Sequence, residues 1–173
     1  MLYGISPLIS PHLMTVLMEM GHGDEIVFAD AHFPGVSHAR RLVRADGLAI
    51  PQLLKAVLPL FPLDRYVQQP VALMRLAAPD TVSPPIWEEY QSLLRTYQGE
   101  SSEIMYLDRE TFYQRSCSAF AIVVTGEMST YGNILLKKGV VEGLTAEARR
   151  NPWHTVFHPA STVSDDGERQ PVR

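Results

Sequence analysis

The sequence predicts an α/β sandwich built around a largely parallel β-sheet. Three short runs, 25–29, 71–74 and 120–124, are almost continuously apolar, which is typical of strands buried on both faces. Segments with helical spacing of apolar residues alternate with these runs, as they do in α/β proteins. Because a strand that is apolar on both faces needs cover on both faces, helices are expected on each side of the sheet.

The remaining elements follow from helix-start and strand patterns. Ser10 and Pro11 have the composition of a helix start, and Gly21 marks the end of that helix. Asp108 is predicted to cap a later helix, since aspartate accepts the unpaired N–H groups of a first turn. The expected helices begin near Pro11, Pro51, Pro85 and Asp108, and the further expected strands cover 104–106 and 134–136.

Length and composition favour one globular domain with an irregular extension. The chain has 173 residues, 46% of them hydrophobic and 20% charged, which suits a single core. Apolar periodicity fades near residue 142, so we expect a domain at 1–141 and an irregular C-terminal extension at 142–173. The single cysteine, Cys117, excludes an intrachain disulfide framework, is expected to be buried in a helix, and favours a cytoplasmic protein.

Charge and hydropathy argue against two classes of partner. The net charge is −4 and the basic residues form no stripe, so nucleic acid is not expected to bind. The sequence contains no apolar run of 18 residues, so no membrane partner is expected. Glycine-rich dinucleotide and phosphate motifs, a GxSxG elbow and a CxxC pair are also missing.

His22, Asp30 and His32 form the densest polar cluster in the sequence. Histidine titrates near neutrality, so His22 could give and take a proton in general acid-base catalysis. A five-residue strand is about 17 Å long, so His22 and Asp30 are expected at opposite ends of it within one subunit. The same residues suit a structural role as helix and loop caps, or a zinc site made of two imidazoles and a carboxylate.

A second candidate site follows the strand at 120–124. Tyr131, Gly132 and Asn133 place a phenol and an amide on a glycine-containing loop, and both groups hydrogen-bond sugar hydroxyls well. Arg109, next to the Asp108 cap, could present planar donors to substrate oxygens. Tyr-Gly-Asn is also an ordinary turn sequence, and Arg109 could be an ordinary surface residue, so this pattern leaves both interpretations open.

Several motifs taken together resemble the L-fucose mutarotase branch of the RbsD/FucU family. Residues 5–8, 21–25, 30–34 and 44–47 match in the first half of the chain. Residues 112–113, 119–123, 125–127 and 131–140 match in the second half. The resemblance spans about residues 1–141 and is specific as a set.

The resemblance implies a fold, an assembly and an activity. It implies a three-layer α/β/α sandwich in a ring-shaped decamer, with each sugar pocket completed by an adjacent subunit. It implies a cofactor-free mutarotase of fucose metabolism, which interconverts the α and β anomers of L-fucose and could also interconvert pyranose and furanose forms of sugars such as D-ribose. A non-catalytic monosaccharide-binding or sensing module is the alternative that the sequence leaves open.

The resemblance also assigns residues. It makes His22 the catalytic acid-base group. The ribose branch carries a histidine in place of Arg109, so the arginine favours fucose. The substrate-binding residues that it implies are Asp30, His32, Arg109, Tyr113, Tyr131, Gly132 and Asn133.

Overall fold

Six strands form one mixed sheet in the computed structural model, which describes residues 2–99 and 103–141. β6 runs antiparallel to β1 and β3, whereas the β1–β5, β2–β5 and β3–β4 pairs are parallel, so the prediction of a mostly parallel sheet is confirmed. The spatial order is β2-β5-β1-β6-β3-β4. The strands are β1 (Glu25–Ala29), β2 (Leu42–Ala45), β3 (Val71–Met74), β4 (Ile104–Leu107), β5 (Ala121–Thr125) and β6 (Ile134–Lys137).

The helices begin close to where the sequence predicts. Ser10 accepts the N–H of Leu13 and Asp108 accepts the N–H of Thr111, so both predicted N-caps are present. The short elements α2 and β2 were not predicted, because four residues are too few to show a periodicity. The helices are α1 (Pro11–Glu19), α2 (Gly35–His38), α3 (Ile50–Val57), α4 (Ile86–Gln98) and α5 (Arg109–Ser118), with a 3₁₀ turn η1 at Leu58–Leu60.

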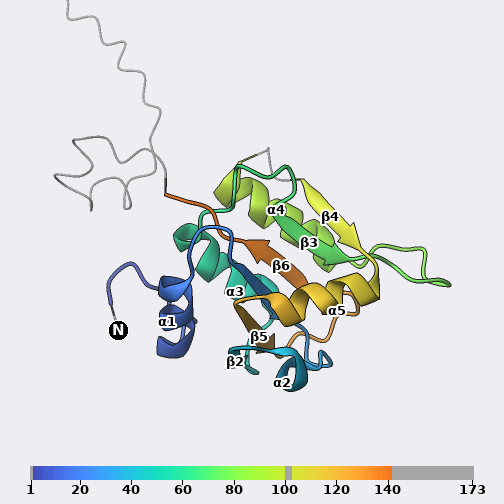
Figure 1. The fold of residues 1–173 in the computed structure, drawn as a ribbon, viewed down its shortest axis with the longest axis horizontal. Coiled ribbons are helices and arrows are strands. Elements are labelled where there is room, and N and C mark those ends of the chain that lie inside the picture. Colours follow the sequence, from blue (N-terminus) through green and yellow to red (C-terminus); the bar gives the residue numbers. More distant parts are fainter. Residues whose placement is uncertain (1, 100–102, 142–173) are drawn as a thin grey trace, which may run out of the picture. The chain divides into compact units, whose positions relative to one another are not determined.

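Helices cover both faces of the sheet and make three layers. Side chains alternate along β1, so Ile26 and Phe28 pack in the core that contains α1, α3 and α4, whereas Val27 and Ala29 pack with Phe112 of α5. In Figure 1, α5 crosses in front of the sheet and α3 lies behind it. The α/β/α sandwich implied by the family resemblance is therefore present.

Two expectations from the sequence need correction or stay open. Cys117 is exposed on α5 instead of buried, because the buried positions of that helix are Phe112 and Ser116. The predicted boundary at residue 141 stays a prediction, since residues 142–173 lie outside the described residues. Within the described residues, no helix is both long enough and apolar enough to span a membrane.

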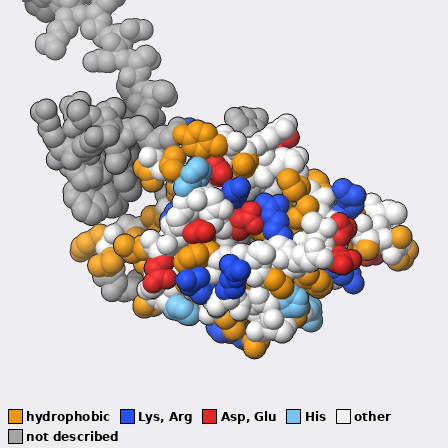
Figure 2. Space-filling model, viewed as in Figure 1, with side chains coloured by type: hydrophobic (Ala, Val, Ile, Leu, Met, Phe, Trp, Pro, Cys, Tyr) orange, Lys and Arg blue, Asp and Glu red, His pale blue; other side chains and the backbone are white. Residues whose placement is uncertain are grey.

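The surface carries both signs of charge. On the face shown in Figure 2, Lys and Arg side chains lie among Asp and Glu side chains instead of forming a continuous basic stripe. That face therefore offers no track of positive charge for a phosphate backbone.

Candidate active site

The site lies where the carboxyl ends of the parallel strands meet. β1, β3, β4 and β5 all end at this edge of the sheet, and β6, which runs the other way, begins there. Loops that follow parallel strands are where α/β sheets place small-molecule sites. The cavity at this edge has a volume of about 300 Å³ and is lined by Asp30, His32, Phe33, Met74, Asp80, Arg109, Tyr113, Thr130, Tyr131 and Asn133.

Asp30 and Asn133 fix each other at the floor of the cavity. The Asn133 side-chain oxygen accepts the Asp30 backbone N–H at 2.9 Å, and the Asn133 amide nitrogen donates to Asp30 Oδ2 at 2.6 Å. Asp30 Oδ1 accepts the backbone N–H of His32 at 3.0 Å. Because Asp30 and Asn133 are both buried, these bonds set one orientation for a carboxylate and an amide that face the cavity.

Arg109 and Tyr113 reach the cavity from the first turns of α5. They stand four residues apart, a spacing that places two side chains on one face of a helix. Asp108 fixes the start of that helix by accepting both the N–H and the hydroxyl of Thr111. The hydrogen bond from the Thr111 N–H is the main reason that the pKa of Asp108 lies below its usual value, and the bond from the Thr111 hydroxyl adds to the effect. The cap therefore stays ionised and defines where Arg109 stands.

Aromatic packing supports the wall of the cavity near Tyr113. The Tyr113 ring contacts Phe33 at a centroid distance of 5.3 Å and His38 at 5.5 Å. His38 Nδ1 is in turn 3.0 Å from the Pro34 carbonyl oxygen, which orients the imidazole. His32 is exposed at the rim, so it can contact a ligand without anchoring the fold.

Helix α4 holds the Tyr131–Asn133 loop in place. Trp87 Nε1 donates to the Tyr131 carbonyl at 2.9 Å, and the Tyr90 hydroxyl donates to the Gly132 carbonyl at 2.6 Å. Burial, helped by neighbouring carboxylates, raises the pKa of Tyr90, so its proton stays in this bond. Gly132 is needed because an added Cβ would lie 2.9 Å from the Ser129 carbonyl oxygen.

Glu127 organises the loop between β5 and β6. Its carboxylate accepts the backbone N–H groups of Met128 and Ser129, and also that of Ile50 at the start of α3. Burial disfavours the ionised carboxylate, but these hydrogen bonds outweigh burial and lower the pKa of Glu127. The loop that carries Tyr131 and Asn133 thus begins from a fixed, charged anchor.

We expect Glu127→Gln to lower the free energy of unfolding at neutral pH by about 1–3 kcal/mol, since an amide NH₂ would face backbone N–H donors. A group whose pKa is lowered on folding stabilises the protein above its unfolded pKa and loses that effect in acid. The difference from wild type should therefore shrink below the unfolded value of 4.5. Urea unfolding at pH 7 and pH 3.5 measures this stability difference, and Glu110→Gln, at an exposed position, is the control. An equal stability difference at both pH values would contradict a lowered pKa for Glu127.

His22 lies at the other end of β1, as the length of the strand predicts. It precedes β1, in the turn where Gly23 donates to the Lys138 carbonyl at the end of β6, and it does not line the Asp30 cavity. His22 Nε2 is 3.2 Å from Asp64 Oδ1, and the ring packs at 5.6 Å against Tyr66. The proposed set of His22, Asp30 and His32 therefore does not converge in one subunit, and the described residues contain no metal-binding group of three or more.

Asp64 is the partner of His22 that sequence reasoning missed. Burial disfavours its ionised form, but the Tyr66 N–H and the His22 ring outweigh burial and lower the pKa of Asp64. An ionised carboxylate only accepts hydrogen bonds, so His22 must donate its Nε2–H to it. The other ring nitrogen, Nδ1, is then the one that can exchange a proton with a ligand.

Lys138 shows a second contact that the sequence did not indicate. Its ammonium group donates to the carbonyl oxygens of Leu17 and Met20 at 2.8 and 2.6 Å. It therefore caps the carboxyl end of α1, just before the turn that carries His22.

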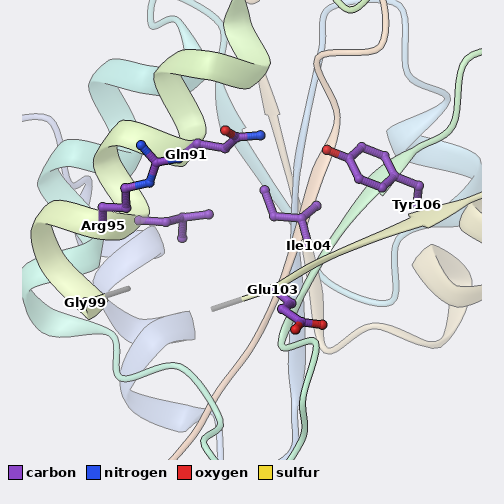
Figure 3. Close-up of a pocket in the computed structure, with 7 residues that line it drawn as sticks. Gln91, Arg95, Gly99, Glu103, Ile104 and Tyr106 are labelled. Atoms are coloured by element: carbon purple, nitrogen blue, oxygen red, sulfur yellow. The ribbon is translucent and has the colours of Figure 1, made fainter. Parts of the chain in front are cut away.

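A larger cavity elsewhere lacks the predicted chemistry. It has a volume of about 460 Å³ and lies between α4 and β4, where Gln91 and Arg95 face Ile104 and Tyr106 (Figure 3). None of the residues predicted from the sequence lines it. The smaller cavity, in contrast, collects Asp30, His32, Arg109, Tyr113, Tyr131 and Asn133, so chemistry and not size identifies the candidate site.

Comparison with known proteins places the chain in a family. The RbsD / FucU transport protein family matches residues 3–141, which is most of the chain. This chain belongs to the RbsD/FucU family. The match ends where the described fold ends, so the fold and the candidate site both lie inside the family's segment.

Three solved structures in this fold are similar to the chain. The fucose mutarotase from Streptococcus pneumoniae, solved with L-fucose, is 50% identical, with coverage of 81% of this chain and 99% of that chain and a TM-score of 0.78. FucU from Bifidobacterium longum is 42% identical, with 80% and 99% coverage and a TM-score of 0.77. Bacillus subtilis RbsD, solved with D-ribose, is 25% identical, with 82% and 99% coverage and a TM-score of 0.61.

Proposed function

We propose that this protein is a sugar mutarotase, an isomerase that interconverts the α and β anomers of L-fucose. The observation that carries the proposal is the cavity of about 300 Å³ that brings together Asp30, Arg109, Tyr131 and Asn133. Carboxylate, guanidinium, phenol and amide groups complement the hydroxyls of a monosaccharide. L-Fucose is the first choice of substrate because the 50% identical relative was solved with it. D-Ribose, bound in the 25% identical RbsD, comes second.

The proposed active site is shared between subunits. Asp30 and His22 stand at opposite ends of the five-residue strand β1, about 17 Å apart along the strand. For His22 to come within hydrogen-bond reach of a sugar held by Asp30, it must therefore belong to another copy of the chain. We therefore propose a homo-oligomer, with the decamer as the expected form, that acts in fucose metabolism in the cytoplasm.

In the proposed mechanism, binding and proton transfer are separate tasks. Asp30 accepts hydrogen bonds from sugar hydroxyls, Arg109 donates to sugar oxygens, and the remaining N–H of Asn133 donates as well. His32 and Tyr113 complete the contacts at the rim and wall. Gly132 does not line the cavity, but it lets the loop turn closely past the Ser129 carbonyl oxygen. These groups hold the anomeric centre next to His22 of the neighbouring subunit.

Proton transfer opens and closes the sugar ring. As the C1–O5 bond breaks, O5 gains a proton and the C1 hydroxyl loses one, which leaves the open-chain aldehyde. Rotation about C1–C2 turns the other face of the carbonyl toward O5, and the reverse transfers close the ring as the other anomer. Ring opening and closing involve no change of oxidation state, so the reaction needs no oxidant or reductant. His22 Nδ1 moves the proton while Asp64 holds Nε2–H and stabilises the imidazolium.

Saturation-exchange NMR on the anomeric protons of L-fucose tests the proposal. We expect the wild-type protein to accelerate α/β exchange, and to accelerate exchange of L-fucose more than that of D-ribose. Exchange of D-ribose alone would shift the substrate assignment. Absence of acceleration with both sugars, together with measurable binding, would favour the alternative of a monosaccharide-binding or sensing module.

A further inference from the structure

The end of β6 brings together the two segments that carry His22 and Asp64. The Lys138 carbonyl accepts the backbone N–H of Gly23 at 2.8 Å, in the turn that carries His22. The Lys137 carbonyl accepts the backbone N–H of Asp64 at 3.0 Å. Each member of the pair is therefore attached to the same strand end by a backbone hydrogen bond, although the two lie far apart in the sequence.

The loop that contains Asp64 gains little support from packing beyond this strand end. Residues 63–68 and Pro70 line a hollow of about 450 Å³, which Gln98 lines as well. The Tyr66 side chain in this loop is 72% exposed. A void gives the atoms that border it no packing partners, so hydrogen bonds must do more of the work of holding Asp64 in place.

Gln98, the last residue of α4, clamps the segment that leads to Asp64. Its side-chain oxygen accepts the backbone N–H of Leu63 at 3.2 Å. Its amide nitrogen donates to the carbonyl oxygens of Leu58 and Phe61 at 3.2 and 3.1 Å, so both amide hydrogens are used. The opposite orientation of the amide would place its oxygen against two carbonyl oxygens, so the network allows one orientation. Since Leu63 immediately precedes Asp64, the clamp acts one residue away from the carboxylate.

We propose that Gln98 is a positioning residue for proton transfer: by clamping residues 58–63 it holds Asp64 against Nε2 of His22. The inference rests on the proposed function, in which His22 Nδ1 exchanges the proton with the sugar. The hydrogen bond made by one ring nitrogen sets which tautomer a histidine adopts. When Asp64 moves away, neutral His22 populates both tautomers, and the form with a proton already on Nδ1 accepts none there. Gln98 does not line the Asp30 cavity, so its effect reaches the reaction through Asp64.

Gln98→Met tests the clamp, because methionine keeps the length of the side chain and removes all three hydrogen bonds. At saturating L-fucose we expect exchange to slow by about five- to fiftyfold, since misplacing a catalytic group by about 1 Å costs up to about 10²-fold. The Kd for L-fucose should change less than about threefold, because Asp30 and Arg109 remain in place. In the Asp64→Asn background, Gln98→Met should slow exchange less than about twofold further, since its route through Asp64 is already lost.

The tautomer of His22 gives a readout that a merely structural role of Gln98 would not change. ¹⁵N NMR of histidine-labelled protein separates protonated from unprotonated ring nitrogens, and the His22→Ala spectrum identifies the His22 signals. We expect neutral His22 to carry its proton on Nε2 in the wild type, as its contact with Asp64 requires. In Gln98→Met, both tautomers should appear.

Gln52→Met is the matched control, because Gln52 is an exposed glutamine on α3 that does not line the hollow. Thermal melting shows whether each variant is folded, and Gln98→Asn, which keeps the amide but is one carbon shorter, repeats the test if Gln98→Met does not fold. A wild-type rate and a single His22 tautomer in Gln98→Met, or a further additive loss in the Asp64→Asn background, would overturn this inference alone. A wild-type protein that exchanges neither L-fucose nor D-ribose would overturn the proposed function, and this inference with it.

Discussion

Replacing His22 with alanine should slow α/β exchange of L-fucose by about 10²–10⁴-fold, the usual contribution of general acid-base catalysis. The fold should persist, because the His22 side chain is 46% exposed. Asp64 keeps a hydrogen bond from the Tyr66 N–H and the nearby Lys137 ammonium, so the substitution leaves this buried carboxylate with partners. The loss should therefore appear in the exchange rate and not in protein yield or melting temperature.

Saturation-exchange NMR at a fixed protein concentration measures the effect. His12→Ala is the matched control, because His12 is an exposed histidine on α1 and takes no part in the site. The affinity for L-fucose should fall much less than the rate, since Asp30 and Arg109 remain in place. An exchange rate within twofold of wild type would remove His22 from the mechanism.

Much of the fold and half of the site geometry could be predicted from short-range patterns. Strand composition located Asp30 just after β1, and the Asp108 cap located Arg109 at the start of α5. Because carboxyl ends of parallel strands meet at one edge, residues at those ends converge even when they are far apart in sequence. The length of β1 also predicted that His22 would lie away from Asp30.

Partners that depend on long-range pairing could not be predicted. Asp64 is 42 residues from His22, and Gln98 is 35 residues from Leu63. Trp87 and Tyr90 show helical spacing, which indicates a buried face but not that each would also donate to a carbonyl of the Tyr131–Asn133 loop. Single-sequence periodicity says which face of a helix is buried, and only the tertiary arrangement says what its polar atoms meet.

Two inactive variants should restore activity to each other when their subunits assemble together. His22→Ala removes proton transfer, and Arg109→Ala removes a sugar-binding group from the opposite end of the sheet. In a mixed oligomer, some pockets receive an intact His22 from one subunit and an intact Arg109 from another. With random assembly about a quarter of the pockets should be complete, so exchange should return to about a quarter of the wild-type rate.

Co-expression of the two chains with different affinity tags, followed by tandem purification, gives the mixed oligomer. Arg109→Ala paired with Asp30→Asn is the matched control, because both changes affect the sugar-binding half of the pocket, so no subunit can supply that half intact. Each variant expressed alone with both tags supplies the baseline. The control pair should remain at that baseline.

L-Fucose exchange by this mixed oligomer tests the shared sugar pocket most directly. Recovery to about a quarter of wild-type rate, with none in the control pair, is the result that a pocket built from two subunits predicts. A mixed oligomer that stays as inactive as its parents, while the wild type exchanges L-fucose, would contradict a pocket in which His22 and Arg109 come from different chains.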